Sequence, residues 1–143
     1  MSYPRSPYDT VGGVVYFGRM VDKIRLKAAG TLHPDLQANL GAGFDKRCVD
    51  FLRVSYDELV KKAGEGLDDE ALLEWGFATG RRPDDEEILI WNEFMRKRGW
   101  DDEATEILIK RKKESGFENR GEIQTMFGYI DADEGRPVQS GMA

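Results

Sequence analysis

The feature that most constrains the fold of this chain is a repeated punctuation of short helical segments. Four stretches begin with Ser or Asp and end at a glycine, over residues 55–64, 68–80, 84–99 and 101–116. Ser and Asp side chains accept hydrogen bonds from the free N–H groups at a helix N-terminus, and glycine readily adopts the conformations that end a helix. The last two stretches are also acidic at the start and basic at the end, as the helix macrodipole favours. This pattern predicts short helices joined by glycine-containing connections.

Further helices are predicted over residues 13–29, 45–54 and 121–130, which gives six or seven in all. No alternating apolar run is bounded by hairpin dipeptides, so strands are not expected. The chain of 143 residues is 40% hydrophobic and 34% charged, which is typical of a globular chain with one core. We therefore predict an all-α fold, a single compact domain over residues 1–143 with a central N-terminal helix. Residues 1–10 are predicted to be an extended arm and residues 135–143 a polar tail.

Composition argues against several classes of function. A net charge of −6 disfavours nucleic acid as a partner, because binding to phosphates requires a basic face. The apolar run over residues 11–17 is too short to span a membrane. A single cysteine, Cys48, and a single histidine, His33, argue against a disulfide framework and a Cys-rich metal site. We predict a cytoplasmic protein that needs no cofactor, metal or membrane, with Cys48 in the core and His33 in an exposed loop.

The segment over residues 13–29 is predicted to be the central helix. At 100° per residue, one narrow apolar stripe runs along it and should face the core. That stripe consists of Val14, Phe17, Val21, Ile24 and Ala28. Gly18 lies beside the stripe and lowers the helix propensity by ~1 kcal/mol relative to alanine, which indicates that something packs closely against it.

Three charged residues, Arg19, Asp22 and Arg25, interrupt this helix at intervals of three, so the carboxylate can meet a guanidinium one turn away on either side. In water each such pair is worth only ~0.3–0.5 kcal/mol, but an unpaired charge on a central helix is strongly unfavourable. The group is therefore either a structural lock or solvated edge, or the lining of a pocket for an anionic ligand, which arginine's planar fork suits. In the pocket alternative, Arg5 or Asn92 would close the site.

Two other stretches have a conspicuous composition. The glycines of residues 40–47 precede a predicted helix start and suggest a phosphate loop, but Asp45 is expected to cap that helix and occupy the free amides itself. Residues 131–136, "DADEGR", begin like a calcium loop, but the chain is too short to complete an EF-hand. We expect these acidic residues to cap the last helix or to pair with arginines of the first.

The chain also resembles a known family. The stretches "SPYDTVGGVVYFGRMVDKIRLKAAG" and "FDKRCVDFLRVSYDEL", a central Trp-containing helix and the closing "YIDADEGR" occur in the order found in a bacterial family of domains of unknown function, number five-zero-six-nine. The resemblance spans nearly the whole chain. It implies a small, mostly helical, cytoplasmic bacterial protein, and it brings no activity, cofactor or site residue.

Two functions from different classes are compatible with these observations. The first is a non-catalytic interaction or regulatory module with an unknown protein partner, whose exposed apolar patch would come from Tyr3, Tyr8, Phe117 or Phe127. The alternative is a protein that binds a small anionic ligand, or an enzyme, with a site lined by the residues named above: Arg5, Arg19, Asp22, Arg25 and Asn92. In an enzyme, Asp22 would be the acid or base. The sequence leaves open whether the protein is an enzyme and whether it is an oligomer.

Overall fold

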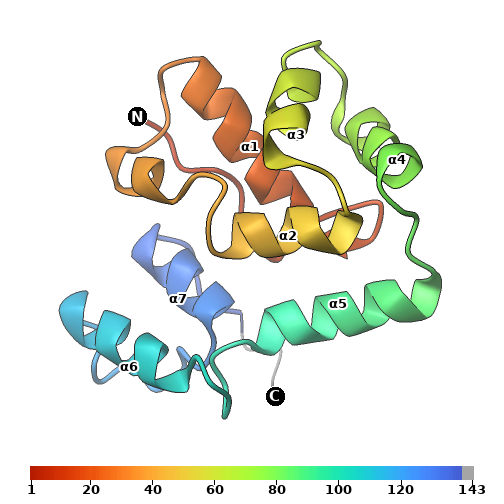
Figure 1. Ribbon diagram of the computed structural model, residues 1–143. Helices are drawn as coiled ribbons and strands as arrows, with labels where there is room; N and C mark the ends of the chain where they lie inside the picture. Colours follow the sequence, from red (N-terminus) through yellow and green to blue (C-terminus); the bar gives the residue numbers. More distant parts are fainter. Residues whose placement is uncertain (140–143) are drawn as a thin grey trace.

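The computed structural model describes residues 1–139 and is mostly helical (Figure 1). Along the chain follow the strands β1 (Thr10–Val11) and β2 (Val14–Val15) and the helices α1 (Phe17–Ala28), η1 (Pro34–Asn39, a 3₁₀ helix), α2 (Phe44–Leu52), α3 (Tyr56–Ala63), α4 (Asp69–Thr79), α5 (Asp85–Lys97), α6 (Thr105–Glu114) and α7 (Met126–Asp133). The predicted all-α class is confirmed, with one small hairpin added. Within residues 1–139, no helix is both long and apolar enough to cross a membrane.

Helix α1 begins later than predicted, because residues 10–15 form an antiparallel hairpin. The turn residues Gly12 and Gly13 have φ values of +55° and +80°, which only glycine adopts readily. Gly-Gly is a hairpin dipeptide, so the expectation of no strands was wrong here. The predicted core stripe holds at Phe17, where the side chain is fully buried, but not at Ala28, which is exposed at the end of the helix.

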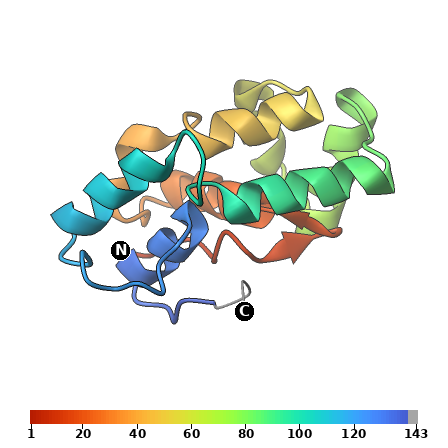
Figure 2. The ribbon, with the colours of Figure 1, turned by 90° about the horizontal axis from the view of Figure 1, so that it is seen from below.

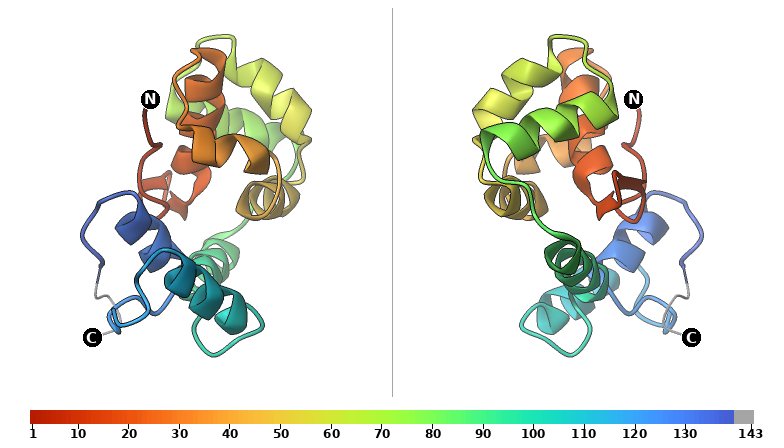
Figure 3. Two further views of the ribbon diagram at one scale, coloured as in Figure 1. Left: turned by 90° about the vertical axis from the view of Figure 1, so that its left-hand side faces the viewer. Right: turned by 90° about the vertical axis from the view of Figure 1, so that its right-hand side faces the viewer.

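The helices form two groups that meet at the start of α1 and the hairpin (Figures 2 and 3). Helices α1 to α4 form the upper group in Figure 1, and α5, α6 and α7 lie below it. Helix α5 packs on β2 and on α7. Its contact with β2 joins the two groups. The main core draws one or more buried side chains from nearly every element: Phe17, Met20, Leu52, Leu59, Leu72, Met95 and Phe127. A smaller cluster around Leu108 and Ile123 lies beneath α6 and α7.

The predicted N-terminal caps form at three helices, where the capping side chain and the N–H group that it accepts from are three residues apart. Ser55 and Asp68 accept the predicted N–H bonds at the starts of α3 and α4, and Asp84 and Glu87 form a reciprocal capping box at α5. Asp45 does not cap α2, contrary to prediction. It lies inside the first turn, fully buried, and Gly43 takes the cap position.

The two chain ends lie together. Residues 135–139 leave α7, and Arg136 turns back to bond the carbonyl oxygen of Pro4 and to pair with Asp131 and Glu134. The start of the predicted polar tail is thus tied to the predicted arm, while residues 140–143 of that tail lie outside the described chain. The arm itself is extended and packs along the domain.

Candidate functional site

The predicted charges of α1 are paired, but with distant residues rather than with one another. Arg5 Nε and Nη2 donate to the two carboxylate oxygens of Asp22 at 2.9 and 2.8 Å. Arg5 Nη2 also lies 2.8 Å from Asp69, which accepts a 2.5 Å bond from Arg25. Gly18 makes room for the Arg5 side chain, since a Cβ there would lie 2.8 Å from Arg5 Nη1. These residues strap the N-terminal arm and α4 to α1, and all the ion-pair partners are partly exposed.

Arg19 points away from Asp22, toward α7. Its Nη1 and Nη2 donate to the carboxylate oxygens of Glu134 at 2.8 and 2.6 Å, and both side chains are only 3% exposed. The prediction that residues 131–136 pair with an arginine of the first helix is therefore confirmed. The expected pairing of Asp22 with Arg19 and Arg25 is wrong, because the carboxylate already receives a two-pronged bond from the arm.

Asn92 contacts the hairpin instead of the charged residues of α1. Its Oδ1 accepts the Val15 N–H at 3.1 Å, and its Nδ2 donates to the Gly13 carbonyl oxygen at 2.8 Å. The neighbouring Trp91, which is buried, donates from its indole to the Val15 carbonyl at 3.1 Å. A two-stranded hairpin leaves backbone groups unpaired on its edges, and buried ones need partners. Asn92 supplies these partners. The expectation that Asn92 closes a site with Arg19, Asp22 and Arg25 is therefore wrong.

A second buried ion pair, which sequence analysis missed, lies next to Arg19. Lys23 Nζ lies 3.0 Å from both oxygens of Asp45, which also accepts the Tyr16 hydroxyl at 2.7 Å and the Gly41 N–H at 3.0 Å. Burial lowers the pKa of Lys23 against the opposing effect of Asp45. Burial and the Asp45 carboxylate raise the pKa of Tyr16 well above its usual value. The sequence did not distinguish Asp45 from its neighbours, because "FDKRCVDFL" carries four charged residues.

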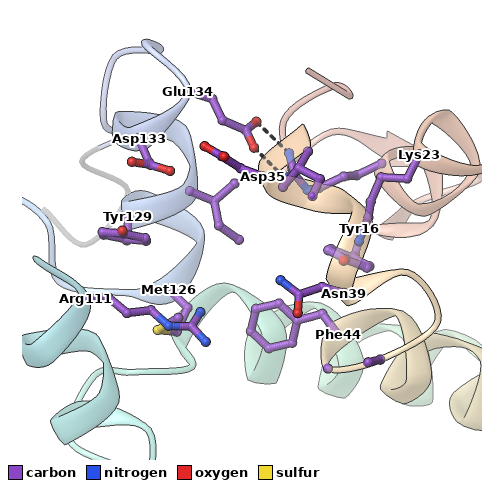
Figure 4. Close-up of a pocket in the computed structure, with 15 residues that line it drawn as sticks. Tyr16, Lys23, Asp35, Asn39, Phe44, Arg111, Met126, Tyr129, Asp133 and Glu134 are labelled. Atoms are coloured by element: carbon purple, nitrogen blue, oxygen red, sulfur yellow. Dashed lines mark hydrogen bonds and ion pairs between the residues drawn. The ribbon is translucent and has the colours of Figure 1, made fainter. Parts of the chain in front are cut away.

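Three members of these buried pairs, Arg19, Glu134 and Lys23, form part of the wall of a pocket of about 370 Å³ (Figure 4). Helix α1 forms one side, η1 and the start of α2 a second, and α6 with α7 a third. The lining combines apolar side chains with charges of both signs: Tyr16, Arg19, Lys23, Asp35, Leu36, Asn39, Ala42, Gly43, Phe44, Arg111, Met126, Tyr129, Ile130, Asp133 and Glu134.

The pocket separates its remaining charges between two ends. Figure 4 shows Asp35 and Asp133 near one end and Arg111 at the other. Burial, with the nearby carboxylates of Glu134 and Asp35, raises the pKa of Asp133. Within residues 1–139, neither Arg111 nor Asp133 forms an ion pair. Asp35 has only His33, at 3.7 Å.

The pocket contains one of the predicted site residues, Arg19, and Arg19 is committed to Glu134. The other four, Arg5, Asp22, Arg25 and Asn92, do not line it. Arg111 belongs to the basic end of the stretch over residues 101–116, which the helix macrodipole explains. Asp133 belongs to residues 131–136, which were expected to cap the last helix or to pair with arginines. Neither pattern marked its residue as part of a pocket. The described chain also holds no group of three or more His, Cys, Asp or Glu side chains arranged to bind a metal ion.

The chain matches, over residues 1–136, the family described as Domain of unknown function (DUF5069). It belongs to this family. The match includes all the helices and every residue that lines the pocket, so the pocket lies within the DUF5069 domain. A search of curated proteins gives no match to the chain.

Proposed function

We propose that this DUF5069 protein binds a small zwitterionic ligand in the pocket between α1, α2 and α7 and does not transform it chemically. The observation that carries the proposal is the charge layout of the pocket. Its buried charges, Arg19, Glu134 and Lys23, all take part in ion pairs, while Arg111 and Asp133, which form none within the described residues, stand at opposite ends. We also place the protein in a bacterial cytoplasm, which the free, buried thiol of Cys48 supports.

The paired charges favour a pre-formed binding site. Arg19 with Glu134 links α1 to α7, and Lys23 with Asp45 links α1 to α2, so three walls are held by ion pairs that solvent barely reaches. A wall fixed before the ligand arrives reduces the conformational entropy lost on binding. We expect these four side chains to shape the pocket rather than to contact the ligand through a free charge.

The groups at the two ends define the ligand class. Arg111 presents a planar guanidinium that suits a carboxylate or a phosphate, and Asp133 with Asp35 suits an ammonium group. Between the ends lie apolar side chains that include Phe44 and Met126. A pocket of about 370 Å³ is at the lower end of the ~300–1,000 Å³ typical of small-molecule sites. A dipeptide, or an amino acid whose ammonium and carboxylate lie at opposite ends of its chain, has the required separation of charges and a comparable size.

The polar groups that line the pocket support binding rather than catalysis. The Tyr16 hydroxyl is committed to Asp45 and the Tyr129 hydroxyl to Ser115. His33 Nδ1 accepts the N–H of Asp35, and Cys48 lies in the core away from the lining, with its thiol pKa raised by burial. Within residues 1–139, the lining therefore offers no nucleophile held by a general base.

A thermal-shift screen with amino acids, dipeptides, simple carboxylates and simple amines tests the proposal, followed by calorimetry of any hit. A ligand at a hundredfold excess over its dissociation constant stabilises the native state by about 2.7 kcal/mol. For a domain of this size that corresponds to a rise in melting temperature of roughly 8 °C. Zwitterions should produce this shift, and compounds with a single charge should produce much less.

Arg111→Ala and Asp133→Asn should each weaken zwitterion binding about tenfold or more, since each removes one of the two ionic contacts. Asp133→Asn should at the same time improve the binding of simple carboxylates, because it removes a negative charge from the pocket. Lys110→Ala, the exposed neighbour of Arg111 outside the lining, is the matched control and should bind like wild type. Zwitterion binding that survives both pocket substitutions, or no stabilisation by any zwitterion, would refute the proposal.

A further inference from the structure

Three of the large exposed apolar side chains lie together on one helix, α5, which does not line the pocket. Leu89, Ile90 and Phe94 of α5 are 53%, 59% and 40% exposed. The patch expected from sequence is not formed as predicted, since Phe127 is fully buried and Tyr8 is partly buried. Helix α5 runs along the outside of the molecule (Figures 1 and 2), so its outer face is open to a partner.

The outer face of α5 has a charge pattern that is complementary to itself. Residues four apart form a row along a helix, and Glu86, Ile90 and Phe94 form such a row on α5, with Arg98 at the cap position just after its last residue. It begins with an acid, continues with two apolar side chains and ends with a base. When such a row is laid antiparallel on a copy of itself, Glu86 meets Arg98 and Ile90 meets Phe94. Every contact in that arrangement is between complementary groups.

Helix α2 strengthens the basic end of this row. The Arg47 guanidinium lies 5.0 Å from the centre of the Phe94 ring, and that of Arg98 lies 5.5 Å from it. Arg98 lies 3.4 Å from Asp102, whereas neither Arg47 nor Glu86 takes part in an ion pair within residues 1–139, so Arg47 is the base left free to face Glu86. A shallow groove of about 540 Å³ runs here between α2 and α5, with Ile90 and Phe94 among its lining residues.

We propose that the protein forms a twofold symmetric dimer in which α5 packs antiparallel against α5 of a second copy. The Ile90 and Phe94 side chains of each copy fill the centre of the interface, and Glu86 of each faces Arg47 and Arg98 of the other. A second copy fits this surface because a twofold interface requires a self-complementary patch, and the acid-to-base row along α5 provides one. This inference does not depend on the ligand pocket.

The expected dimer is weak. One pair of helices covers less area than the ~1,200–2,000 Å² buried in standard stable interfaces, so we expect dissociation in the micromolar to millimolar range. Sedimentation velocity of the full chain, over a concentration series from roughly 1 µM to 1 mM, should show a monomer that converts to a dimer. Because opposite charges meet at both ends, high salt should shift the midpoint to higher concentration.

Matched substitutions locate the interface. Ile90→Asp places a charge at its centre and should raise the dissociation constant at least tenfold. Ile109→Asp introduces the same change at an α6 residue that is 60% exposed and lies outside the α5 row, so it should leave association unchanged. Circular dichroism of both variants verifies that the fold is retained.

A charge swap tests the antiparallel register. Glu86→Lys and Arg47→Glu should each weaken association severalfold, because each brings like charges together across the interface. The double variant restores opposite charges there and should recover at least half of the lost affinity, which a merely structural role of either residue would not produce. A wild type that stays monomeric to the highest concentration overturns the proposal. So does a dimer that is insensitive to Ile90→Asp, one that Ile109→Asp disrupts equally, or a swap that fails to recover.

Discussion

Glu134→Gln is the substitution that should most clearly separate the buried charges of α1 from the partly exposed ones. The Glu134 carboxylate accepts two bonds from Arg19 and one from Arg136, and it is 3% exposed. Glutamine has nearly the same shape, but it removes the charge and turns an NH₂ group toward a guanidinium. The main effect is therefore to leave the Arg19 charge buried without its counter-ion.

The magnitude follows from that burial. Removing one partner of a buried ion pair costs about 3–5 kcal/mol, and because glutamine keeps one acceptor oxygen we expect about 3 kcal/mol. Asp22→Asn should cost only about 1 kcal/mol, since Asp22 and Arg5 are 24% and 27% exposed and water can solvate what remains. A domain of this size is stable by about 5–15 kcal/mol, so both variants should fold.

Urea unfolding followed by circular dichroism measures both values, provided that the slope against denaturant stays unchanged. A double-mutant cycle with Arg19→Met, Glu134→Leu and their combination completes the test. Glu134→Leu strands the buried Arg19 charge, Arg19→Met leaves Glu134 with the partly exposed Arg136 alone, and the combination strands neither, so the coupling energy should be at least about 2 kcal/mol. If Glu134→Gln costs no more than Asp22→Asn, the Arg19–Glu134 pair is effectively solvated. The conclusion that it holds α7 to α1 would then be refuted.

Three further outcomes are expected. Phe17→Ala and Ile24→Ala should each cost about 2–5 kcal/mol in urea unfolding, because both side chains lie in the core, whereas exposed Lys27→Ala should cost less than about 0.5 kcal/mol. Asp133→Asn should stabilise the fold at neutral pH by ~0.5 kcal/mol or less after solvent screening, since folding raises the pKa of this carboxyl and so opposes its ionisation. That gain should vanish as the pH falls below about 4, where the wild-type carboxyl is also neutral. Cys48 should resist thiol reagents until the protein unfolds, because it is fully buried and burial raises its pKa.

The parts of the fold that the sequence predicted depend on local interactions. A cap at Asp68 or Asp84 is decided by an N–H group three residues away, so its chemistry can be recognised without the tertiary structure. The core face of α1 follows from the helical period. The hairpin was missed although its signal is also local, because Gly13 and the second strand, Val14–Val15, were assigned to the predicted helix over residues 13–29. Only the positive φ of both glycines distinguishes the hairpin turn from the start of a helix.

The ion-pair partners could not be predicted in the same way, because they are chosen by tertiary packing. Asp22 had two arginines within one turn, and it instead binds Arg5, seventeen residues earlier in the chain. The local pairs are worth a few tenths of a kcal/mol, so any well-oriented distant partner can outcompete them. The partner of Lys23 is decided in the same way, because only the position of α2 brings Asp45 within 3.0 Å of its ammonium group.

The two alternatives raised by the sequence, a lock and a pocket, prove to involve largely different residues. On α1, Arg19 and Lys23 are buried and paired, and Asp22 and Arg25 bind the arm and α4. The charges that we assign to the ligand come from α6, α7 and η1 instead. Changes at Arg111 or Asp133 should therefore alter binding with little loss of stability, whereas a change at Glu134 should lower stability first and binding only through the pocket wall. A Glu134→Gln variant that kept its stability but lost the ligand would place Glu134 among the groups that contact the ligand.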